Sequence, residues 1–286
     1  MIYFLLVFQQ LLASSTHIIG QDVGRAVDPS IVLLFRATIA SAAFLLIIAV
    51  KGESLRTIER KDWLRLALLG LLNVPINQAL FLEGLQHTSA ANSALLYAMT
   101  PALVFLLTLF IHREAPTRWK ILGIIMAFIG VAMIVFEKGA ALTSDTTLGN
   151  LMIFAAVVAW ALYTLIGKPL VEKYGALRTT GLNMAVGALI YLPIGLLTSD
   201  MSEVSVISAI SWTEILYMAI MASVVNYFLW FYALGKLETS RVAIFQNLQP
   251  VMTTVLALLL GTATITTYFV VGGVMALIGV ILVQLA

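Results

Sequence analysis

Residues 121–135 read ILGIIMAFIGVAMIV, an apolar run without a charged side chain. A transmembrane β-strand would alternate lipid-facing and lumen-facing residues, and this run has no such alternation. A helix, by contrast, crosses the bilayer core of about 30 Å with roughly 20 apolar residues. The run therefore predicts a membrane-spanning helix.

The composition of the whole chain points the same way. Of its 286 residues 61% are hydrophobic and only 10% are charged, which excludes a soluble globular protein. The formal net charge of +2 is too small for a nucleic-acid binder. The chain has no cysteine, so disulfides and thiolate chemistry are excluded.

Ten apolar segments of spanning length are separated by polar or turn-forming residues. They cover residues 2–20, 30–50, 63–82, 89–111, 119–136, 148–167, 179–198, 212–234, 240–261 and 266–286. We therefore predict an all-α integral membrane protein with ten transmembrane helices. No Lys or Arg precedes the first segment, which predicts a retained helix and not a cleaved signal peptide.

The basic residues predict the orientation. With the N-terminus in the cytoplasm, thirteen of the 16 Lys and Arg residues fall on the inner side, Arg25 and Lys138 fall outside, and Arg36 lies within a span. Cytoplasmic loops carry an excess of Lys and Arg. We therefore expect a multi-pass protein of the cytoplasmic (inner) membrane with both termini in the cytoplasm.

The second half of the sequence repeats features of the first. An offset of 149 residues aligns Asn77 with Asn226 and Pro101 with Pro250. The shared Asn, Pro and Gly residues carry this evidence, because apolar helices match easily by chance. We predict one five-helix repeat at residues 1–140 and a second at 141–286.

An odd number of spans per repeat forces the second copy to enter the membrane in the opposite sense. Inverted repeats of this kind serve alternating access, with the binding site near the bilayer midplane at the repeat interface. The sequence therefore favours a secondary transporter over an enzyme or a receptor.

Several pieces of the chain resemble a known family. They are LFRA at Leu34–Ala37, the segment Ala79–Pro101, and the segment Ala233–Pro250 followed by the helix with Gly272 and Gly279. Together they are similar to the drug/metabolite transporter (DMT) superfamily, EamA-like branch, over essentially the whole chain. The resemblance implies two five-helix repeats around a central cavity, with the last helix of each repeat outside as support. It also implies export of amino acids or other small metabolites.

Polar and aromatic side chains at mid-span depth predict the pocket, because buried polar groups are costly unless they are satisfied. The predicted substrate-binding residues are Asn77, Asn226, Tyr97, Trp160, Tyr163, Tyr227, Trp230 and Gln246. Amides and aromatics without a carboxylate suit a neutral or zwitterionic solute with an apolar part. The alternative for the two asparagines is interhelical hydrogen bonding, and Gln78 is expected to face elsewhere as packing.

Two prolines fall near the centres of their spans and are expected to shape the pocket. Pro101 and Pro250 each remove one backbone hydrogen bond and free a carbonyl. An ordinary kink without a functional role is the alternative interpretation.

Arg36 and His17 are the two cationic candidates at membrane depth. We expect Arg36 to brace the first repeat through carbonyls or a loop acid such as Asp22, Asp28 or Glu83. Its alternative role is contact with an anion or carboxylate. His17, predicted one turn from the outer end of its span, is a possible proton-coupling residue, or else an interfacial histidine with satisfied hydrogen bonds.

Competing function classes find little support. No predicted span contains Asp, no His or Cys pair has zinc-ligand spacing, and Gly167-Lys168 runs into Pro169 without the phosphate-binding GxxxxGK[ST] loop. We therefore predict no enzyme, no metal and no cofactor.

The predicted function is a secondary transporter that exports amino acids or similar zwitterionic or amphipathic solutes by alternating access. Its expected partners are a small-molecule solute and membrane lipid, with no nucleic acid, and it is expected to be a monomer or a homodimer. The alternative is a non-transporting membrane sensor or assembly subunit, in which the mid-span Asn and aromatic residues would pack against one another without a cavity.

Overall fold

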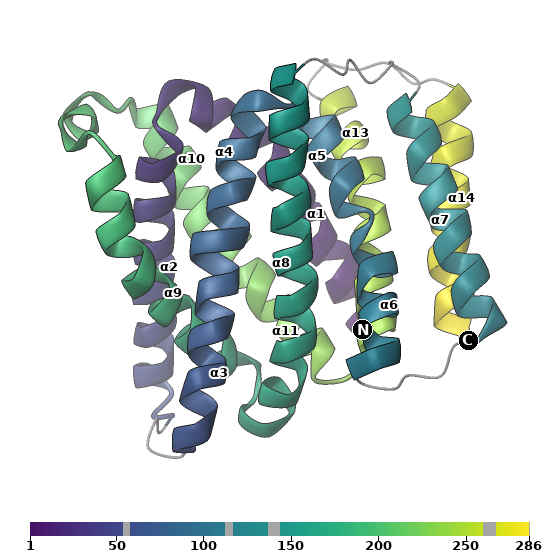
Figure 1. The fold of residues 1–286 in the computed structure, drawn as a ribbon, viewed down its shortest axis with the longest axis horizontal. Helices are drawn as coiled ribbons and strands as arrows, with labels where there is room; N and C mark the ends of the chain where they lie inside the picture. Colours follow the sequence, from purple (N-terminus) through teal and green to yellow (C-terminus); the bar gives the residue numbers. More distant parts are fainter. Residues whose placement is uncertain (54–57, 112–116, 137–143, 260–266, 286) are drawn as a thin grey trace.

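The computed structural model describes residues 1–53, 58–111, 117–136, 144–259 and 267–285. Within these ranges the chain is helical and contains no β-strand. The prediction of an all-α membrane protein is therefore confirmed, and Figure 1 shows the helices as a bundle with their axes roughly side by side.

Each predicted span corresponds to one helix or to a series of helical segments over its described residues. The first five correspond to α1 (Ile2–Ala26), α2 (Pro29–Val50), the continuous rod of α3 (Arg60–Leu71), η2 (Leu72–Gln78) and α4 (Ala79–His87), the pair α5 (Ala90–Tyr97) and α6 (Thr100–Ile111), and α7 (Arg118–Phe136). The others correspond to α8 (Ser144–Tyr174), α9 (Ala176–Thr198), the rod of α10 (Ala209–Ala219), η4 (Ile220–Val225) and α11 (Asn226–Leu234), the series α12 (Thr239–Ala243), η5 (Ile244–Leu248) and α13 (Gln249–Leu259), and α14 (Thr267–Leu285).

Six of these helices are long and apolar enough to cross a membrane within the described residues. They are α1, α2, the α3–α4 rod, α8, α9 and the α10–α11 rod. The chain is therefore a multi-pass membrane protein, and the full count of ten spans stays a prediction. A short 3-10 helix, η3 (Met201–Val206), connects α9 to α10.

Local sequence explains where several helices begin. The Asp28 carboxylate accepts a 2.7 Å hydrogen bond from the Ser30 amide, and Pro29 occupies the first turn of α2, where no intrahelical N–H is needed. Between α8 and α9 stands Gly175, whose φ of +81° is in the left-handed region that glycine adopts without strain. One residue is therefore enough to reverse the chain there.

Irregular turns interrupt corresponding helices of the two halves. A π-helical segment lies in the middle of each long rod, η2 before α4 and η4 before α11. The fourth span breaks at Ala98 and Met99, between α5 and α6, and the ninth changes to 3-10 geometry in η5. Such turns are rare in soluble and membrane helices and often mark functional positions.

Two equivalent helices, α2 and α9, pack against each other in antiparallel directions. A Cβ placed on Gly195, near the end of α9, would meet Leu34, near the start of α2, at 3.2 Å. A Cβ on Gly181, near the start of α9, would meet Phe44 of α2 at 3.1 Å. The order of these contacts along the two helices defines the antiparallel arrangement.

The last helices of the two halves, α7 and α14, form a second antiparallel pair. A Cβ on Gly123 would lie 2.7 Å from the carbonyl oxygen of Gly279, and Gly130 faces Gly272 in the same way. Glycines therefore let the two backbones approach closely, as small residues do between membrane helices. Figure 1 shows this pair at the right edge of the bundle, far from α3 and α9.

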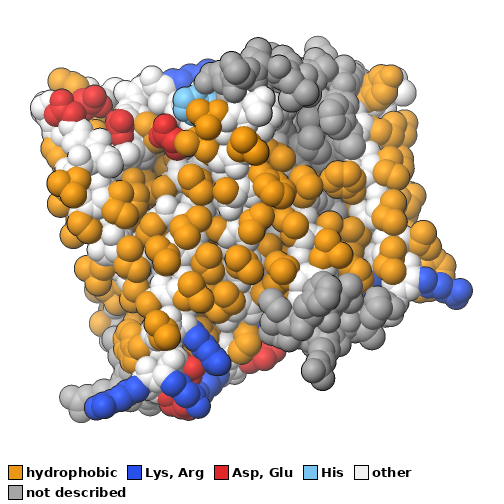
Figure 2. Space-filling model, viewed as in Figure 1, with side chains coloured by type: hydrophobic (Ala, Val, Ile, Leu, Met, Phe, Trp, Pro, Cys, Tyr) orange, Lys and Arg blue, Asp and Glu red, His pale blue; other side chains and the backbone are white. Residues whose placement is uncertain are grey.

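Figure 2 shows a broad apolar belt around the bundle, with Lys and Arg gathered mainly at its lower end and most of the visible Asp and Glu at its upper left. Leu46, Leu64 and Leu197 are 64%, 78% and 87% exposed, which is favourable only when lipid covers them. We call the end that carries Lys61, Arg65, Lys173 and Arg178 the basic end.

Candidate functional site

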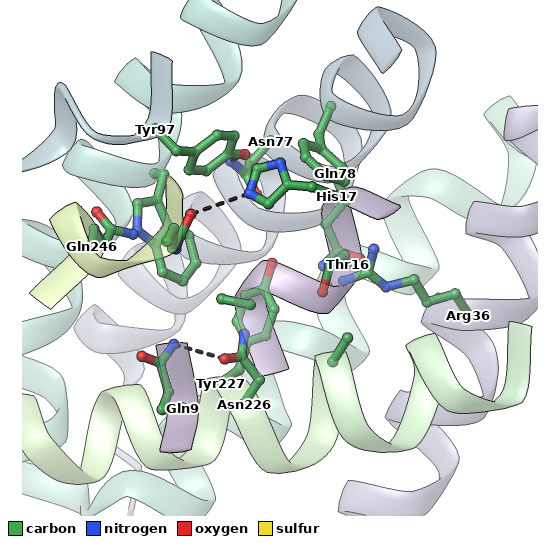
Figure 3. Close-up of a pocket in the computed structure, with 15 residues that line it drawn as sticks. Gln9, Thr16, His17, Arg36, Asn77, Gln78, Tyr97, Asn226, Tyr227 and Gln246 are labelled. Carbon is green, nitrogen blue, oxygen red and sulfur yellow. Dashed lines mark hydrogen bonds between the residues drawn. The ribbon is translucent and has the colours of Figure 1, made fainter. Parts of the chain in front are cut away.

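A cavity of about 50 Å³ lies inside the bundle, among helices of both halves. Its lining residues are Gln9, Ala13, Thr16, His17, Arg36, Asn77, Gln78, Phe81 and Tyr97 from the first half, and Trp160, Ala222, Asn226, Tyr227, Gln246 and Gln249 from the second. Most of these side chains are polar or aromatic, and Figure 3 shows how the labelled ones converge.

The structure brings six of the eight predicted substrate-binding residues together around this cavity. They are Asn77, Asn226, Tyr97, Trp160, Tyr227 and Gln246. Tyr163 and Trp230 do not line it. Tyr163 stacks on Trp160 with a centroid distance of 5.3 Å and donates its hydroxyl proton to Asn183 Oδ1, and Trp230 donates from Nε1 to Thr164 Oγ1 at 3.2 Å. Both support the cavity wall from behind.

The two equivalent asparagines lie at the two π-helical segments. Asn77, in η2, donates from Nδ2 to the Tyr97 hydroxyl at 2.8 Å and to the Ala156 carbonyl at 2.7 Å. Asn226, the first residue of α11 after η4, accepts a 2.7 Å hydrogen bond from Gln9 Nε2. Each asparagine therefore makes a hydrogen bond to another helix and also lines the cavity. The position of each residue is compatible with both predicted roles, packing and contact with solute.

An aromatic wall closes one side of the cavity. The Trp160 and Tyr227 rings meet edge to face with centroids 5.2 Å apart. The Tyr97 ring meets Phe81 edge to face at 5.7 Å. Edge-to-face pairs of this kind hold aromatic rings rigidly, so the wall offers a fixed apolar surface to an apolar part of a solute.

Arg36 reaches the cavity from α2 and lies deep in the protein, with 2% of its surface exposed. Its Nε donates to Ser223 Oγ, in η4, at 2.8 Å, and none of the ion pairs among the described residues involves it. The expectation that Arg36 braces the first repeat through a loop acid is therefore wrong. The guanidinium points inward, away from the surface acids, and its contact joins the first half to the second.

His17 also faces the cavity, and its predicted place one turn from the outer end of its span stays a prediction. Helix α1 continues to Ala26, so His17 is buried well inside it. Its Nδ1 lies 3.1 Å from Ser93 Oγ and its Nε2 3.2 Å from Gln249 Oε1. An Nε2–H that donates to the amide oxygen, and an Nδ1 that accepts from the serine, fit a neutral imidazole. A role in proton coupling stays a prediction.

A chain of amides continues from His17 across the cavity. Gln249 donates to Gln10 Oε1 at 3.0 Å, Gln10 donates to Gln9 Oε1 at 2.7 Å, and Gln9 donates to Asn226. The chain ties α1 to α11 and α13 of the second half. Figure 3 shows its bond from Gln9 to Asn226.

Pro101 and Pro250 lie outside the lining, each at the second residue of a helix, α6 and α13. A proline in the first turn of a helix needs no N–H partner, so each proline marks a new helical segment and does not kink a continuous helix. Tyr97 and Gln246 stand a few residues before these starts, at or just before the irregular turns. A role of the two prolines in shaping the cavity stays a prediction.

Nine of the fifteen lining residues were not predicted as substrate-binding: Gln9, Ala13, Thr16, His17, Arg36, Gln78, Phe81, Ala222 and Gln249. Gln78 corrects the expectation that it faces elsewhere. It lies in η2, where the wider π turn brings consecutive side chains closer in direction than an α turn does. Glutamines at mid-span depth are the available sequence signal for Gln9 and Gln249, since polar side chains there need a polar neighbour.

The charged side chain in the described lining is a cation. None of the described lining residues is Asp or Glu, and Arg36 carries the formal charge. Among the described residues no group of three His, Asp or Glu side chains is placed to hold a metal ion. The cavity can hydrogen-bond a polar solute, pack against its apolar part, and offer a positive charge.

Ion pairs at the basic end join the two halves below the cavity. The buried Asp62 carboxylate of α3 accepts hydrogen bonds from Lys173 Nζ and the Tyr174 hydroxyl of α8, both at 2.7 Å. Lys173 also pairs with Glu59 at 2.5 Å, and this contact lowers the pKa of the Glu59 carboxyl below its usual value. These contacts hold α3 and α8 together at that end.

Two further pairs connect the halves at the basic end. Lys120 lies 2.8 Å from Glu238, and the lysine lowers the pKa of that carboxyl. Arg178, from α9, lies 2.9 Å from Glu53. At the opposite end the ion pair among described residues, His87 with Glu83, lies within α4. The inter-half ion pairs are therefore concentrated at the basic end.

Comparison with known proteins identifies relatives over the whole length. An uncharacterized transporter of Bacillus subtilis, YyaM, is 29% identical over 98% of this chain and 92% of its own length. A probable terminal-alkyne amino-acid exporter of Streptantibioticus cattleyicolor is 27% identical over 88% of this chain and 82% of its own. A protein of known crystal structure shares the fold with a TM-score of 0.80 over 98% of this chain and 96% of its own, at 16% identity.

The EamA-like transporter family matches this chain twice, at residues 1–136 and 147–285. The two matches cover nearly all of the described helices and include every lining residue of the cavity. Relatives from bacteria and archaea carry the name of transporter. This protein belongs to the EamA-like transporter family, and it is a membrane transporter and not an enzyme.

Proposed function

We propose that this protein is a secondary transporter that moves amino acids or similar zwitterionic or amphipathic solutes out of the cell across the cytoplasmic membrane. The observation that carries the proposal is the buried polar cavity lined from both halves of the chain. The exporter from Streptantibioticus cattleyicolor supports the direction and the class of solute. The basic end faces the cytoplasm in this proposal, together with both chain ends.

The transport mechanism that we infer is a rocking movement between two inverted repeats, residues 1–140 and 141–286. Equivalent helices that pack in antiparallel directions, α2 with α9 and α7 with α14, support an inverted relation. An axis along the membrane normal would make equivalent helices parallel. The cavity lies where the two repeats meet, so movement of one repeat against the other exposes it to alternate sides.

The cavity also weighs against a non-transporting sensor or assembly subunit. In such a protein the mid-span Asn and aromatic side chains would fill the space between the helices. Here Trp160 Nε1 and Gln246 Oε1 are buried without a hydrogen-bond partner in the described part of the chain. Buried polar atoms usually have partners, so a transported solute or water is the natural ligand.

Solute counterflow tests this function. Purified protein in proteoliposomes is loaded with one unlabelled solute and mixed with a trace of the labelled form, over a panel of amino acids and small cationic drugs, with and without a pH gradient. We expect exchange of at least one amino acid. A folded preparation that exchanges none of the panel would contradict the proposal.

A double variant connects the exchange to the cavity. Replacing Asn77 and Asn226 together with Leu removes two lining amides while keeping side chains of similar size, and should abolish exchange without unfolding the protein. Asn92→Leu, at the start of α5 outside the lining, is the matched control and should exchange normally. Full exchange by the double variant would return both asparagines to a packing role.

A further inference from the structure

We infer that Arg36 is the carboxylate-binding residue of the cavity and that the solute must carry a carboxylate group. This inference rests on the proposed function and narrows its substrate class. Three features carry it: the burial of Arg36, the unpartnered nitrogen of its guanidinium, and the absence of an acid from the described lining.

The hydrogen bonds of Arg36 leave part of its guanidinium available. Nε is used by Ser223, which fixes the direction of the side chain, while Nη1 is buried and has no partner among the described residues. Figure 3 shows the guanidinium end of Arg36 directed toward Thr16, on the cavity side of α1. The nitrogen is therefore held in place for a ligand that accepts hydrogen bonds.

The charge balance calls for an anion. A buried charge is costly unless it is paired. Removing one partner of a buried ion pair strongly destabilises a protein, because the other charge is left buried and uncompensated. Neither a described lining residue nor a described ion pair supplies a negative partner to Arg36. The hydrogen bonds of His17 fit a neutral ring, so Arg36 carries the formal charge of the lining.

The geometry favours a carboxylate over a more highly charged anion. Planar guanidinium matches a carboxylate with paired N–H donors. A phosphate dianion would place a second negative charge in a cavity whose described lining offers one cation. The other unpartnered atoms of the lining are the donor Trp160 Nε1 and the acceptors Gln78 Oε1 and Gln246 Oε1, and they complement the rest of a polar solute, including an amino group.

A matched series of solutes tests the requirement. The series is leucine, leucinamide, 4-methylpentanoate and isoamylamine, which keep the branched apolar group and remove the carboxylate or the amino group in turn. Binding is measured by competition against labelled leucine in counterflow. We expect leucine and 4-methylpentanoate to compete, and the two compounds without a carboxylate to be weaker by roughly 10- to 100-fold.

The outcomes separate this inference from the proposed function. Leucinamide that competes as well as leucine overturns the carboxylate requirement while transport stands. If the exchanged solute is a carboxylate other than leucine, competition by that solute is compared with competition by its own amide. An exchanged solute without a carboxylate overturns the inference, and a panel without any exchange overturns the proposed function itself.

Variants of Arg36 distinguish binding from packing. Arg36→Gln should remove the preference for leucine over leucinamide, and Arg36→Lys should keep part of it, because the charge remains. Arg25→Gln, at the exposed end of α1, is the control and should leave the preference unchanged. A structural brace alone would lower the melting temperature of Arg36→Gln and preserve the preference. If that variant does not fold, the solute series on the unaltered protein decides.

Discussion

Replacing Asp62 with Asn should loosen the basic end of the transporter. The Asp62 carboxylate is 1% exposed, and it joins α3 of the first half to α8 of the second through Lys173 and the Tyr174 hydroxyl. In the rocking movement that we propose, opening of the cavity toward the basic end separates these elements. The substitution keeps the size of the side chain and removes its charge, so it weakens the contact without creating a cavity.

The magnitude follows from the two short bonds. Hydrogen bonds to charged groups contribute about 1.5–3 kcal/mol and neutral ones about 0.5–1.5 kcal/mol, so two bonds lose about 2 kcal/mol or more. Lys173 is 38% exposed and keeps its pair with Glu59, which reduces the loss. We therefore expect a shift of about 1–2 kcal/mol toward the open state, or about 5- to 30-fold in its population.

The assay uses the absence of cysteine from the sequence. A single Cys at Ala222, which lines the cavity and is 1% exposed, reports access when it reacts with a membrane-impermeant maleimide. In vesicles of known orientation, Asp62→Asn should raise the labelling rate from the basic side by about 5- to 30-fold. Asp200→Asn is the matched control, because Asp200 bonds only locally, to Ser202.

A single result would refute the reasoning. If folded Asp62→Asn protein is labelled from the basic side at the rate of the parent, the contact does not hold that end closed. Faster labelling from the opposite side alone would place the movement elsewhere. The melting temperature of each variant, measured in the same detergent, separates local opening from general unfolding.

Three other perturbations probe the same framework. Lys120 lowers the pKa of Glu238 below its usual 4.5, so the stabilisation from this pair is present above that value and is lost as pH falls through the lowered pKa. Because acid also slows the reaction of any thiol with maleimide, labelling from the basic side is compared with that of the unfolded protein at the same pH. This ratio should rise in acid, and less so in Glu238→Gln. A Cβ on Gly187 would meet the Gly70 carbonyl at 2.6 Å, so Gly187→Ala should lose about 1–3 kcal/mol of stability in thermal unfolding, and a variant as stable as the parent would contradict this packing. Tyr163→Phe removes a hydroxyl behind the cavity and should cost about 1 kcal/mol of stability while leaving the KM for exchange unchanged; a raised KM would place Tyr163 in contact with solute.

The helices were predictable because length and apolarity determine where a chain crosses lipid. The predicted segments and the described helices agree, and the main deviations are extensions through polar residues. Helix α1 runs to Ala26, six residues beyond its predicted end at Gly20, so His17 lies further from the end of the helix than predicted. Apolar length reports the part of a helix that lies in the hydrocarbon, and polar residues continue the same helix beyond it.

The types of residue that line the cavity were predictable, but the direction in which each side chain points was less so. Mid-span amides and aromatics are informative because each polar atom there needs a partner, and six of the eight chosen residues line the cavity. Tyr163 and Trp230 lie one layer behind, since depth along a helix does not specify which neighbour a side chain meets. Gln78 turns inward within a π-helical segment, and no 3.6-residue periodicity in the sequence encodes such a turn.

The family matches this chain twice, but the two halves contribute different side chains to the cavity. An offset of 147 residues aligns Arg36 with Asn183. Asn183 is fully used in packing, because it accepts from Asn73 and Tyr163 and donates to the Thr179 carbonyl. Arg36 instead presents a nitrogen without a described partner beside the cavity. In the mechanism that we propose, the two repeats exchange their roles in the movement, and Arg36 holds a solute with one charged end in a single orientation.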